Sequence, residues 1–401
     1  LFVTYTSVSG DDDKSALQAL QFKLILMPNA LKIIDLFAGA GGFSLGAARA
    51  GMQVISSVEI DPFANETHSR NFPNTKHIGF NIAELSGQDL LAYSDLKRGE
   101  LDGLIGGPPC QGFSSIGRKD PNDSRNSLFG HFIRLVAETQ PRFFVAENVP
   151  GILQDRNKEL LDAALASIPA NYTLLTPTKI SAAVFGAPTT RTRVFFVGFD
   201  PARCAGLEMD IFAPLPGQEL TTVKEALAGL PEMINPAWQS EENSWQPVCR
   251  LPSSFFNDRA QSHIPHGVGD EFATPPFNEA GYTSGCFGTV HGPDIAARYH
   301  NLKPREKDPI SKSVRLDFDG FCPTLRAGTG SDKGSYQAVR PIHPSQPRVI
   351  TPREAARLQG FPDWFLLHPT KWHSFRQLGN SVSPIVAERI LTAIAIRLGR
   401  Q

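Results

Sequence analysis

Short apolar segments that end in Gly, Pro or acidic residues constrain the fold of this 401-residue chain more than any other feature. The first covers residues 31–37 and runs directly into the turn Ala38-Gly39-Ala40-Gly41-Gly42. Further buried strands are predicted at 53–59, 101–105, 142–146 and 194–199, and helical patterns lie between them, for example at about 44–50 and 127–139. This alternation predicts an α/β fold in which helices cover both faces of a mostly parallel sheet.

The composition and the hydrophobic pattern of the sequence change after about Asp200. Pro, Gly, Asn and Ser become frequent, and hydrophobic periodicity stays weak until Thr351. Ser383-Pro384 predicts a helix start, and one face of that helix would carry Ile385, Val386, Ile390, Ile394 and Leu398. We therefore expect an extension of residues 1–29 outside the fold, a large domain of 30–205, a smaller irregular domain of 206–374, and a segment of 375–401 that packs back on the large domain.

Charge is distributed unevenly along the chain. The formal net charge is −1, which argues against a purely electrostatic nucleic-acid binder. Residues 1–110 hold 8 Lys and Arg against 12 Asp and Glu, whereas residues 296–357 hold 12 against 6. The basic segment suits a phosphate backbone or an ordinary solvated surface, and charge alone does not separate the two.

The five cysteines, at 110, 204, 249, 286 and 322, form no CxxC pair. Their odd number and their spacing argue against a disulfide framework and against a structural zinc site, so we expect no metal and a reducing, cytoplasmic environment. No apolar run approaches the ~20 residues that a membrane helix needs. Residues 1–26 also lack the basic start and long apolar core of a secretory signal.

Gly39 and Glu59 have the spacing of an adenosine-binding pair. A Gly-rich turn after the first strand lets a ligand approach the backbone closely. An acidic residue about 20 positions later, at the end of the second strand, can bind ribose hydroxyls. For the glycines alone, a plain tight turn is the alternative. Because the turn does not read GxGxxG, the pattern favours a smaller adenosyl compound over a dinucleotide.

Pro108-Pro109-Cys110-Gln111 is the sharpest local feature. Two prolines restrict the backbone directly after a predicted strand, so the next side chain, a thiol, is presented at the sheet edge where α/β proteins bind ligands. Most cysteines are inert core residues, which we expect of the other four. A thiolate at position 110 suits covalent addition to C6 of a pyrimidine, a step that prepares C5 to accept a methyl group.

Two further groups of polar residues belong to neighbouring strands. Glu147 ends the strand at 142–146 and can hydrogen-bond ring N3 and the exocyclic amine of cytosine together. Arg191 and Arg193 precede the strand at 194–199 and, as alternate residues, point the same way, toward Glu147, a base carbonyl or a phosphate. A surface carboxylate and a solvated strand edge are the alternatives for each residue taken alone. Together with Cys110, these residues predict one catalytic site.

Six motifs in this chain resemble those of the DNA cytosine-5 methyltransferases of the bacterial restriction-modification type. They occur in the family's order between residues 31 and 382 and cover nearly the whole chain. They are Asp35-Leu36-Phe37-Ala38-Gly39-Ala40-Gly41-Gly42-Phe43-Ser44, Gly107-Pro108-Pro109-Cys110-Gln111-Gly112-Phe113-Ser114, Glu147-Asn148-Val149, Arg191-Thr192-Arg193, Arg357-Leu358-Gln359-Gly360-Phe361-Pro362 and Gln377-Leu378-Gly379-Asn380-Ser381-Val382.

The resemblance implies a Rossmann-like domain that binds S-adenosyl-L-methionine, a smaller target-recognition domain, and methylation of C5 in a cytosine flipped out of double-stranded DNA. Cys110 would add to C6 and Glu147 would hold N3, while Arg191 and Arg193 would support the base and the glutamate. The residues implied in cofactor binding are Phe37, Ala38, Gly39, Gly41, Gly42, Glu59, Ile60, Asn81, Ile82, Pro108, Asn380 and Ser381.

The resemblance also implies a mobile loop at 111–129 that closes over the DNA, with contacts from Gln111, Ser114, Arg118, Lys119 and Arg125. Target recognition would fall within about 206–350. There, a loop at 324–330 carries Arg326, which is suited to reading guanine in the major groove, although a Gly-rich surface turn is an equal alternative.

Two positions depart from the family pattern. Asn81 stands where the family has an acidic residue for the adenine amine, and its amide oxygen can still accept that hydrogen bond. Thr189-Thr190 stands where the family often has Gln before the arginine pair. Neither departure touches the predicted chemistry, and only the affinity for the cofactor is in question.

Three other functions fit parts of the pattern. A tRNA cytosine-5 methyltransferase would share the pocket, but the Cys-Phe-Thr signature of that group is absent. A DNA-binding protein with an inactive site would not need Cys110, Glu147 and Arg193 together. A nucleotide-dependent oxidoreductase would bind a nicotinamide at 39–42. The favoured prediction is a monomeric DNA methyltransferase, with any cognate restriction endonuclease acting without a stable complex.

Overall fold

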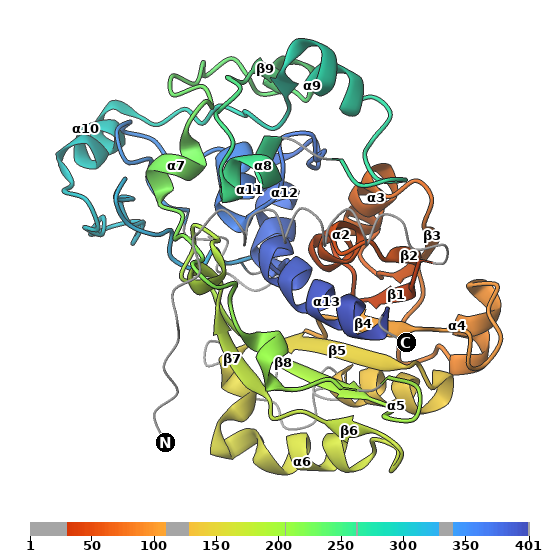
Figure 1. The fold of residues 1–401 in the computed structure, drawn as a ribbon. Coiled ribbons are helices and arrows are strands. Elements are labelled where there is room, and N and C mark those ends of the chain that lie inside the picture. The colour runs from red at the N-terminus through yellow and green to blue at the C-terminus, as the bar shows by residue number, and fades with distance from the viewer. Residues whose placement is uncertain (1–29, 110–127, 205, 262–263, 329–339, 400–401) are drawn as a thin grey trace.

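The computed structural model describes residues 30–109, 128–204, 206–261, 264–328 and 340–399 (Figure 1). The expected α/β fold is confirmed by its central eight-stranded sheet, in the order β3-β2-β1-β4-β5-β8-β6, with β7 also paired to β8. The sheet strands are β1 Lys32–Leu36, β2 Gln53–Val58, β3 Lys76–Ile78, β4 Gly103–Gly106, β5 Phe143–Asn148, β6 Thr173–Leu174, β7 Thr178–Ser181 and β8 Thr192–Phe199. Strands β9 Gln246–Pro247 and β10 Tyr282–Thr283 form a separate pair.

The sheet is parallel from β3 to β5 and antiparallel where β8 meets β5, β6 and β7. The long α-helices of this part are α2 Gly42–Arg49, α3 Pro62–Asn71, α4 Gly87–Tyr93, α5 Leu128–Thr139, α6 Lys158–Ala166 and α13 Pro384–Leu398. Short 3-10 helices cover Pro150–Leu153, Asp155–Asn157, Ala182–Phe185, Met209–Phe212 and Glu242–Ser244. In Figure 1, α5 and α6 lie on one face of the sheet and α2 and α13 on the other.

Alternate residues of the central strands feed two separate hydrophobic cores, one on each face of the sheet. Ile33, Ile105, Val145 and Phe195 belong to the core that includes α2 and α13. Their sequence neighbours Ile34, Leu104, Phe144 and Phe196 belong to the core that includes α4, α5 and α6. Burial on both faces explains why these strands read as continuous apolar runs in the sequence.

The last helix packs on the first part of the chain, as predicted. The predicted apolar face of α13, which includes Ile385, Val386 and Ile390, is buried. A Cβ atom on Gly46 in α2 would lie 2.3 Å from Cβ of Ala387. The two helices therefore approach more closely than a side chain at position 46 would permit.

The irregular texture after Asp200 corresponds to short helices joined by loops (Figure 1). They are α7 Val223–Leu227, α8 Phe255–Gln261, α9 Thr274–Ala280, α10 Pro293–Asn301, α11 Pro352–Gln359 and α12 Lys371–Asn380. Arg357 in α11 forms a fully buried ion pair with Asp363, at 2.5 Å, and donates to the Ala226 carbonyl in α7. Arg357 of the Arg-Leu-Gln-Gly-Phe-Pro motif therefore connects α11 to α7 and to the segment that follows α11.

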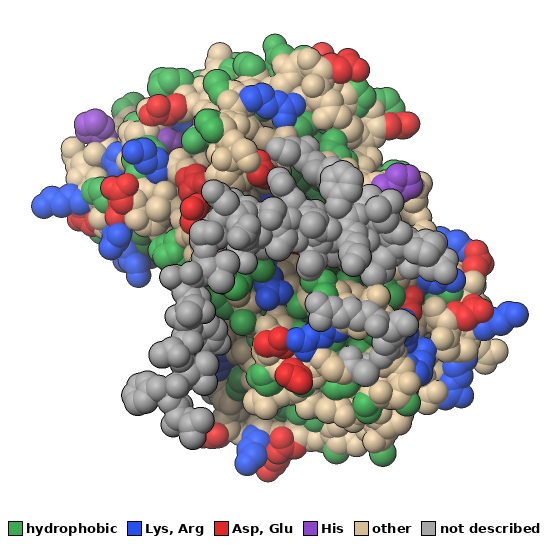
Figure 2. Space-filling view, in the orientation of Figure 1, with side chains coloured by type: hydrophobic (Ala, Val, Ile, Leu, Met, Phe, Trp, Pro, Cys, Tyr) green, Lys and Arg blue, Asp and Glu red, His purple; other side chains and the backbone are tan. Residues whose placement is uncertain are grey.

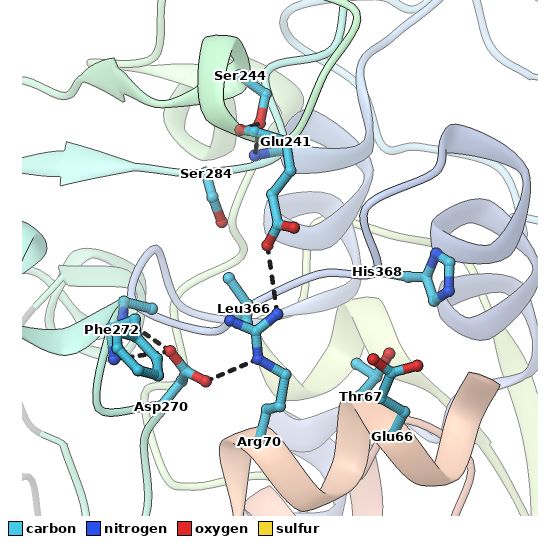
Figure 3. A network of polar contacts seen from close by, with 12 residues as sticks. Glu66, Thr67, Arg70, Glu241, Ser244, Asp270, Phe272, Ser284, Leu366 and His368 are labelled. Carbon is cyan, nitrogen blue, oxygen red and sulfur yellow. Dashed lines mark hydrogen bonds and ion pairs between the residues drawn. The ribbon is translucent and has the colours of Figure 1, made fainter. Parts of the chain in front are cut away.

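A polar network ties the irregular region to α3 (Figure 3). Arg70 contacts Asp270 through Nε, at 2.9 Å, and Glu241 through Nη1, at 3.3 Å. Beside it, the Asn71 side chain donates to the Leu366 carbonyl at 2.9 Å and accepts from the Leu366 amide at 2.8 Å. The end of α3 is thus bound to three segments that follow it by 170 residues or more.

Candidate active site

The turn after β1 has the open geometry that a ligand needs. Phe37 and Gly39 both have positive φ, 57° and 56°, so the backbone bends sharply at the end of β1. A Cβ atom on Gly39 would meet no other atom within 4 Å. The space beside Gly39 can therefore receive part of a ligand. The sequence predicts such a close approach to the backbone for an adenosyl compound.

Glu59 lies against this turn, as its spacing predicts. Its carboxylate accepts a hydrogen bond from the Gly39 amide at 2.8 Å and another from the Asp61 amide at 2.8 Å. Burial raises the pKa of Glu59 above its usual value, and these amide donors oppose that shift. Each carboxylate oxygen has a further lone pair, so the group can still accept from ribose hydroxyls. The neighbouring Ile60 side chain is 64% exposed and forms a free apolar surface at the end of β2.

Gly41 and Gly42 are required by packing within the chain. A Cβ atom on Gly41 would lie 2.3 Å from the ring of Phe72. One on Gly42 would lie 2.0 Å from Oγ of Ser381 and 2.3 Å from the Val382 carbonyl oxygen. The structure therefore brings Ser381 to the first turn of α2, next to the Gly-rich turn, although the two are far apart in sequence.

The segment that contains Asn81 and Ile82 is held by α5. Arg134 donates from Nη2 to the carbonyls of Ile82 and Leu85, both at 2.9 Å. Its Nη1 contacts both oxygens of Glu138 at 2.9 Å, and Glu138 accepts from the Gly87 amide. The Ile82 side chain is buried in the core, whereas Asn81 is half-buried and accepts from the Ala83 amide at 3.1 Å. Sequence reasoning missed Arg134, because its partners are backbone carbonyls.

A buried chain of polar side chains starts directly below the turn. The Ser44 hydroxyl donates to Asp35 at 2.6 Å and contacts Nε2 of His68 at 2.9 Å, and Nδ1 of His68 lies 2.9 Å from Nε2 of His77. Burial raises the pKa of Asp35 to about 7, with Ser44 opposing the shift. Burial also lowers the pKa of His68 well below its usual value, so His68 is neutral. This series of side-chain contacts connects Asp35 and Ser44 to α3 and β3, and it was not predicted.

The predicted catalytic carboxylate forms an ion pair at the ends of β5 and β8. Nε of Arg193 lies 2.8 Å from Oε1 of Glu147, and both side chains are largely buried. Glu147 also borders the end of β4, since a Cβ atom on Gly107 would lie 3.4 Å from Oε2. Next to it, Asn148 donates to the Pro108 carbonyl at 3.3 Å. The carboxylate therefore lies beside the strand end that leads to residue 110.

Arg191 is buried near this pair but makes different contacts. Its Nη1 donates to the Gly379 carbonyl at 2.9 Å and the Leu325 carbonyl at 3.5 Å, and Nη2 donates to the Asn380 carbonyl at 3.5 Å. Burial, followed by the charge of Arg193, lowers the pKa of Arg191 to about 9. Arg191 thus connects the start of β8 to the end of α12, where Asn380 and Ser381 lie.

The loop that contains Arg326 joins the same region. Thr190 donates from its amide to the Cys322 carbonyl at 2.9 Å, and a Cβ atom on Gly379 would lie 2.5 Å from the Ala327 amide nitrogen. Arg326 itself is exposed. Residues 322–327 therefore contact the segment just before β8 and the end of α12.

Several predicted residues lie outside the described part of the chain. They are Cys110, Gln111, Ser114, Arg118, Lys119 and Arg125. The other four cysteines are free, and burial raises the thiol pKa of Cys204 to about 11, of Cys286 to about 12, and of Cys322 further still. Those three agree with the expected inert core cysteines, whereas Cys249 is exposed.

Some of the cations at 296–357 are paired with acids of the same segment. Arg298 pairs with Asp308 at 2.8 Å, and Arg305 pairs with Asp317 at 2.8 Å. Figure 2 shows basic and acidic side chains together over this region, near α10. The charge count of the segment therefore overstates the number of free cations. Within the described residues, no helix combines the length and apolar character required to cross a bilayer.

A Gly-rich turn after β1, an acid at the end of β2, and a carboxylate–guanidinium pair at the end of β5 define a Rossmann-like enzyme. Comparison with known proteins gives the family. The model of the C-5 cytosine-specific DNA methylase family matches residues 31–395. The type II methyltransferase M.XorII of Xanthomonas oryzae pv. oryzae is 37% identical over 363 residues, which cover 89% of this chain and 82% of that protein. M.DdeI of Desulfomicrobium norvegicum is 32% identical over 397 residues, which cover 91% and 88%.

Solved structures agree. A candidate DNA modification methyltransferase encoded within an E. coli prophage is 46% identical, with a TM-score of 0.83, over 92% of this chain and 100% of that chain. The Dnmt2 methyltransferase of S. pombe shares the fold, with a TM-score of 0.55, 16% identity, and coverage of 93% and 99%. The chain belongs to the C-5 cytosine-specific DNA methylase family, whose general reaction is methyl transfer to C5 of cytosine in DNA.

Proposed function

We propose that this protein transfers the methyl group of S-adenosylmethionine to C5 of a cytosine flipped out of a specific duplex DNA sequence, through a covalent bond between Cys110 and C6. The observation that carries the proposal is the 2.8 Å contact between Glu147 and Arg193 beside the end of β4. Cys110 follows Pro109, the last residue of that strand end, in the sequence.

The residues around the Gly39 turn fit the cofactor. The space beside Gly39 is open, and the Glu59 carboxylate lies at its edge with acceptor capacity for ribose hydroxyls. Ile60 offers an exposed apolar side chain for the adenine, and Asn81 an amide oxygen for its amine. Ser381 lies against the turn from the other side. When bound there, S-adenosylmethionine supplies an electrophilic methyl group on a sulfonium centre.

The catalytic residues divide the chemistry between them. The Cys110 thiolate adds to C6 of the target cytosine, and the π electrons of the C5–C6 bond move toward C5. Glu147 acts as the acid that donates a proton to N3, where negative charge develops, and Arg193 fixes the orientation of that carboxyl group. Once C5 has gained its methyl group, the proton on C5 passes to a water molecule, the electrons of the C5–H bond re-form the C5–C6 double bond, and the bond from C6 to the Cys110 sulfur breaks. Unstacking the cytosine costs on the order of a few kcal/mol, which contacts in this pocket must offset.

We assign different functions to different parts of the chain. Residues 30–205 hold the cofactor and catalytic residues, residues 206–374 carry target recognition, and residues 375–401 return to complete the cofactor site. We propose that the protein acts as a monomer in the bacterial cytoplasm. A matching restriction endonuclease, where there is one, would act on the same DNA sequence without a stable complex.

Covalent trapping tests the proposal directly. A duplex with 5-fluorocytosine at the target should remain bonded to the protein, because fluorine cannot leave C5 as a proton does. The Cys110→Ala variant should form no adduct, and an adduct with that variant would refute the assignment. Long-read sequencing of DNA from cells that express the chain identifies the target sequence. Methylation of RNA but not DNA would favour a tRNA methyltransferase instead.

Calorimetry tests the cofactor site separately from catalysis. The Glu59→Ala variant should bind S-adenosylhomocysteine at least tenfold more weakly, which corresponds to about 1.4 kcal/mol or more. Glu100→Ala, which removes an exposed carboxylate outside the turn, is a matched control and should bind normally. Unchanged affinity in Glu59→Ala would exclude the proposed ribose contact.

A further inference from the structure

One face of α12 carries a row of residues that leads to the active site. Lys371, Phe375 and Gly379 follow one another at intervals of four, so they share a face and are about 6 Å apart along the helix axis. The guanidinium of Arg340 lies over the Phe375 ring, 4.2 Å from its centre. At the end of the row, Gly379 contacts the backbone of the Arg326 loop and accepts a hydrogen bond from Arg191.

Lys371 in this row and Arg340 above it lack acidic partners in the described part of the chain. Arg340 is half-buried, and within the described residues its guanidinium contacts the Phe375 ring. The Lys371 ammonium donates to the Gly288 carbonyl and, at 3.1 Å, to the side-chain oxygen of Gln239. Both of these acceptors are neutral. Partly buried cations are normally paired, so this pair of charges favours an external anion.

Neighbouring groups increase this preference. Burial and the charge of Arg340 lower the pKa of Lys371, which places two positive groups within electrostatic range of each other. Burial, followed by the charges of Lys371 and Arg348, lowers the pKa of His291. By contrast, Arg298 and Arg305 of the same region are paired with Asp308 and Asp317. Arg376 of α12 is likewise paired with Asp61, at 3.0 Å. Within the described residues, the positive charges of Arg340 and Lys371 are therefore not cancelled by an acid in the way that those near α10 are.

The row also lies in the right place for DNA. Its Gly379 end is bonded to Arg191, the strand neighbour of Arg193, which holds Glu147. A DNA strand whose cytosine is flipped toward Glu147 must pass the edge of this pocket. The phosphates of that strand carry the negative charge that would balance Arg340 and Lys371.

We propose that Arg340 and Lys371 form a phosphate-binding subsite for the DNA backbone next to the target cytosine. This inference rests on the proposed function, in which duplex DNA enters beside Glu147. The Phe375 ring holds the Arg340 guanidinium in place, and Gly288 and Gln239 hold the Lys371 ammonium. The contact supplies affinity for any DNA sequence and gives no preference for a base.

The salt dependence of DNA binding tests the subsite. For the full chain and a duplex of arbitrary sequence, the plot of log K against log salt should lose about 0.9 of its slope in Arg340→Gln and again in Lys371→Gln. Each change corresponds to roughly eightfold weaker binding at 0.1 M salt. Arg340→Lys keeps the charge and should keep the slope. Lys158→Gln, an exposed charge on α6 at the opposite end of the molecule (Figure 1), is the matched control.

The possible results separate the two proposals. Equal slopes for the wild type, Arg340→Gln and Lys371→Gln would overturn the phosphate subsite, even if both variants bind more weakly, because a packing role changes affinity without releasing counterions. Equal slopes with intact covalent trapping would leave the proposed function standing. A wild-type chain that binds no duplex at any salt concentration would overturn both.

Discussion

Nε of Arg193 lies 2.8 Å from Oε1 of Glu147, and the two residues come from adjacent antiparallel strands, β8 and β5. The pair forms across the sheet, so neither side chain depends on a flexible loop for its position. A carboxyl group held in this way would be preorganised for the contact with N3 of cytosine that we propose.

Because the two residues act as one unit, the effects of their substitutions on the activation free energy of methylation should not be additive. Glu147→Gln and Arg193→Gln should each lower the single-turnover rate of methylation by about 10²- to 10⁴-fold. The double variant should be only slightly slower than the slower single variant. Rapid-quench measurement with saturating DNA and cofactor provides the rates. Fully multiplicative losses would show that the two residues contribute independently.

Close packing at Gly42 gives a prediction about stability. Gly42→Ala should lower the free energy of unfolding by about 1–3 kcal/mol, because the new Cβ atom would collide with Ser381 and with the Val382 backbone. The control is Gly130→Ala in α5, where a Cβ atom meets nothing within 4 Å. That change should be neutral or stabilising by up to about 1 kcal/mol. Urea unfolding compares the two, and equal stability would contradict the packing argument.

The buried Asp35 should make stability depend on pH. Its pKa is about 7 in the folded protein against an ordinary 3.8, so the folded state binds more protons between these values. The stabilising contribution is complete below pH 3.8 and is lost as the pH rises toward 7. The Asp35→Asn variant cannot ionise at this position, so it does not lose this stability as the pH rises. Its unfolding free energy relative to wild type should therefore rise by roughly 2–3 kcal/mol between pH 5 and pH 8.

Urea unfolding at the two pH values measures the Asp35 effect. Asp102→Asn, which alters a half-buried carboxylate at the other end of the sheet, is a suitable control. A constant difference between Asp35→Asn and wild type from pH 5 to pH 8 would mean that Asp35 titrates normally.

Arg134 should act as a positioning residue for the adenine end of the cofactor. Arg134→Gln leaves the Ile82 and Leu85 carbonyls without their donor and loosens the segment that carries Asn81. Affinity for S-adenosylhomocysteine should fall by about tenfold, or about 1.4 kcal/mol. If Asn81 accepts from the adenine amine, as proposed above, the preference for the adenosyl over the inosyl analogue should also fall.

Calorimetry with both analogues separates positioning from general damage. Glu59→Ala should weaken the two analogues equally, since the ribose is common to them. If Arg134→Gln kept the wild-type preference for adenine while losing affinity, its role would be limited to fold stability.

Much of the fold and the site was predictable from local sequence. The apolar strand segments, the Gly-rich turn and the start of α13 at Ser383-Pro384 all follow from short-range chemistry. Glu59 and Glu147 could be chosen as candidates because each stands at the end of a predicted strand, and the carboxyl ends of parallel strands share one edge of the sheet. The short strands β3, β6 and β7 were missed, because two to four residues carry too little pattern.

The sequence by itself determined which residue types stand at the strand ends, because strand periodicity and turn chemistry act over a few residues. Tertiary structure alone decided their partners. It placed Ser381 against Gly42, directed Arg191 to the end of α12, joined Asp35 to His77 through Ser44 and His68, and left Arg340 on Phe375 without an acid. These contacts join residues that are distant along the chain, and only the packing of complete helices and strands brings such residues together.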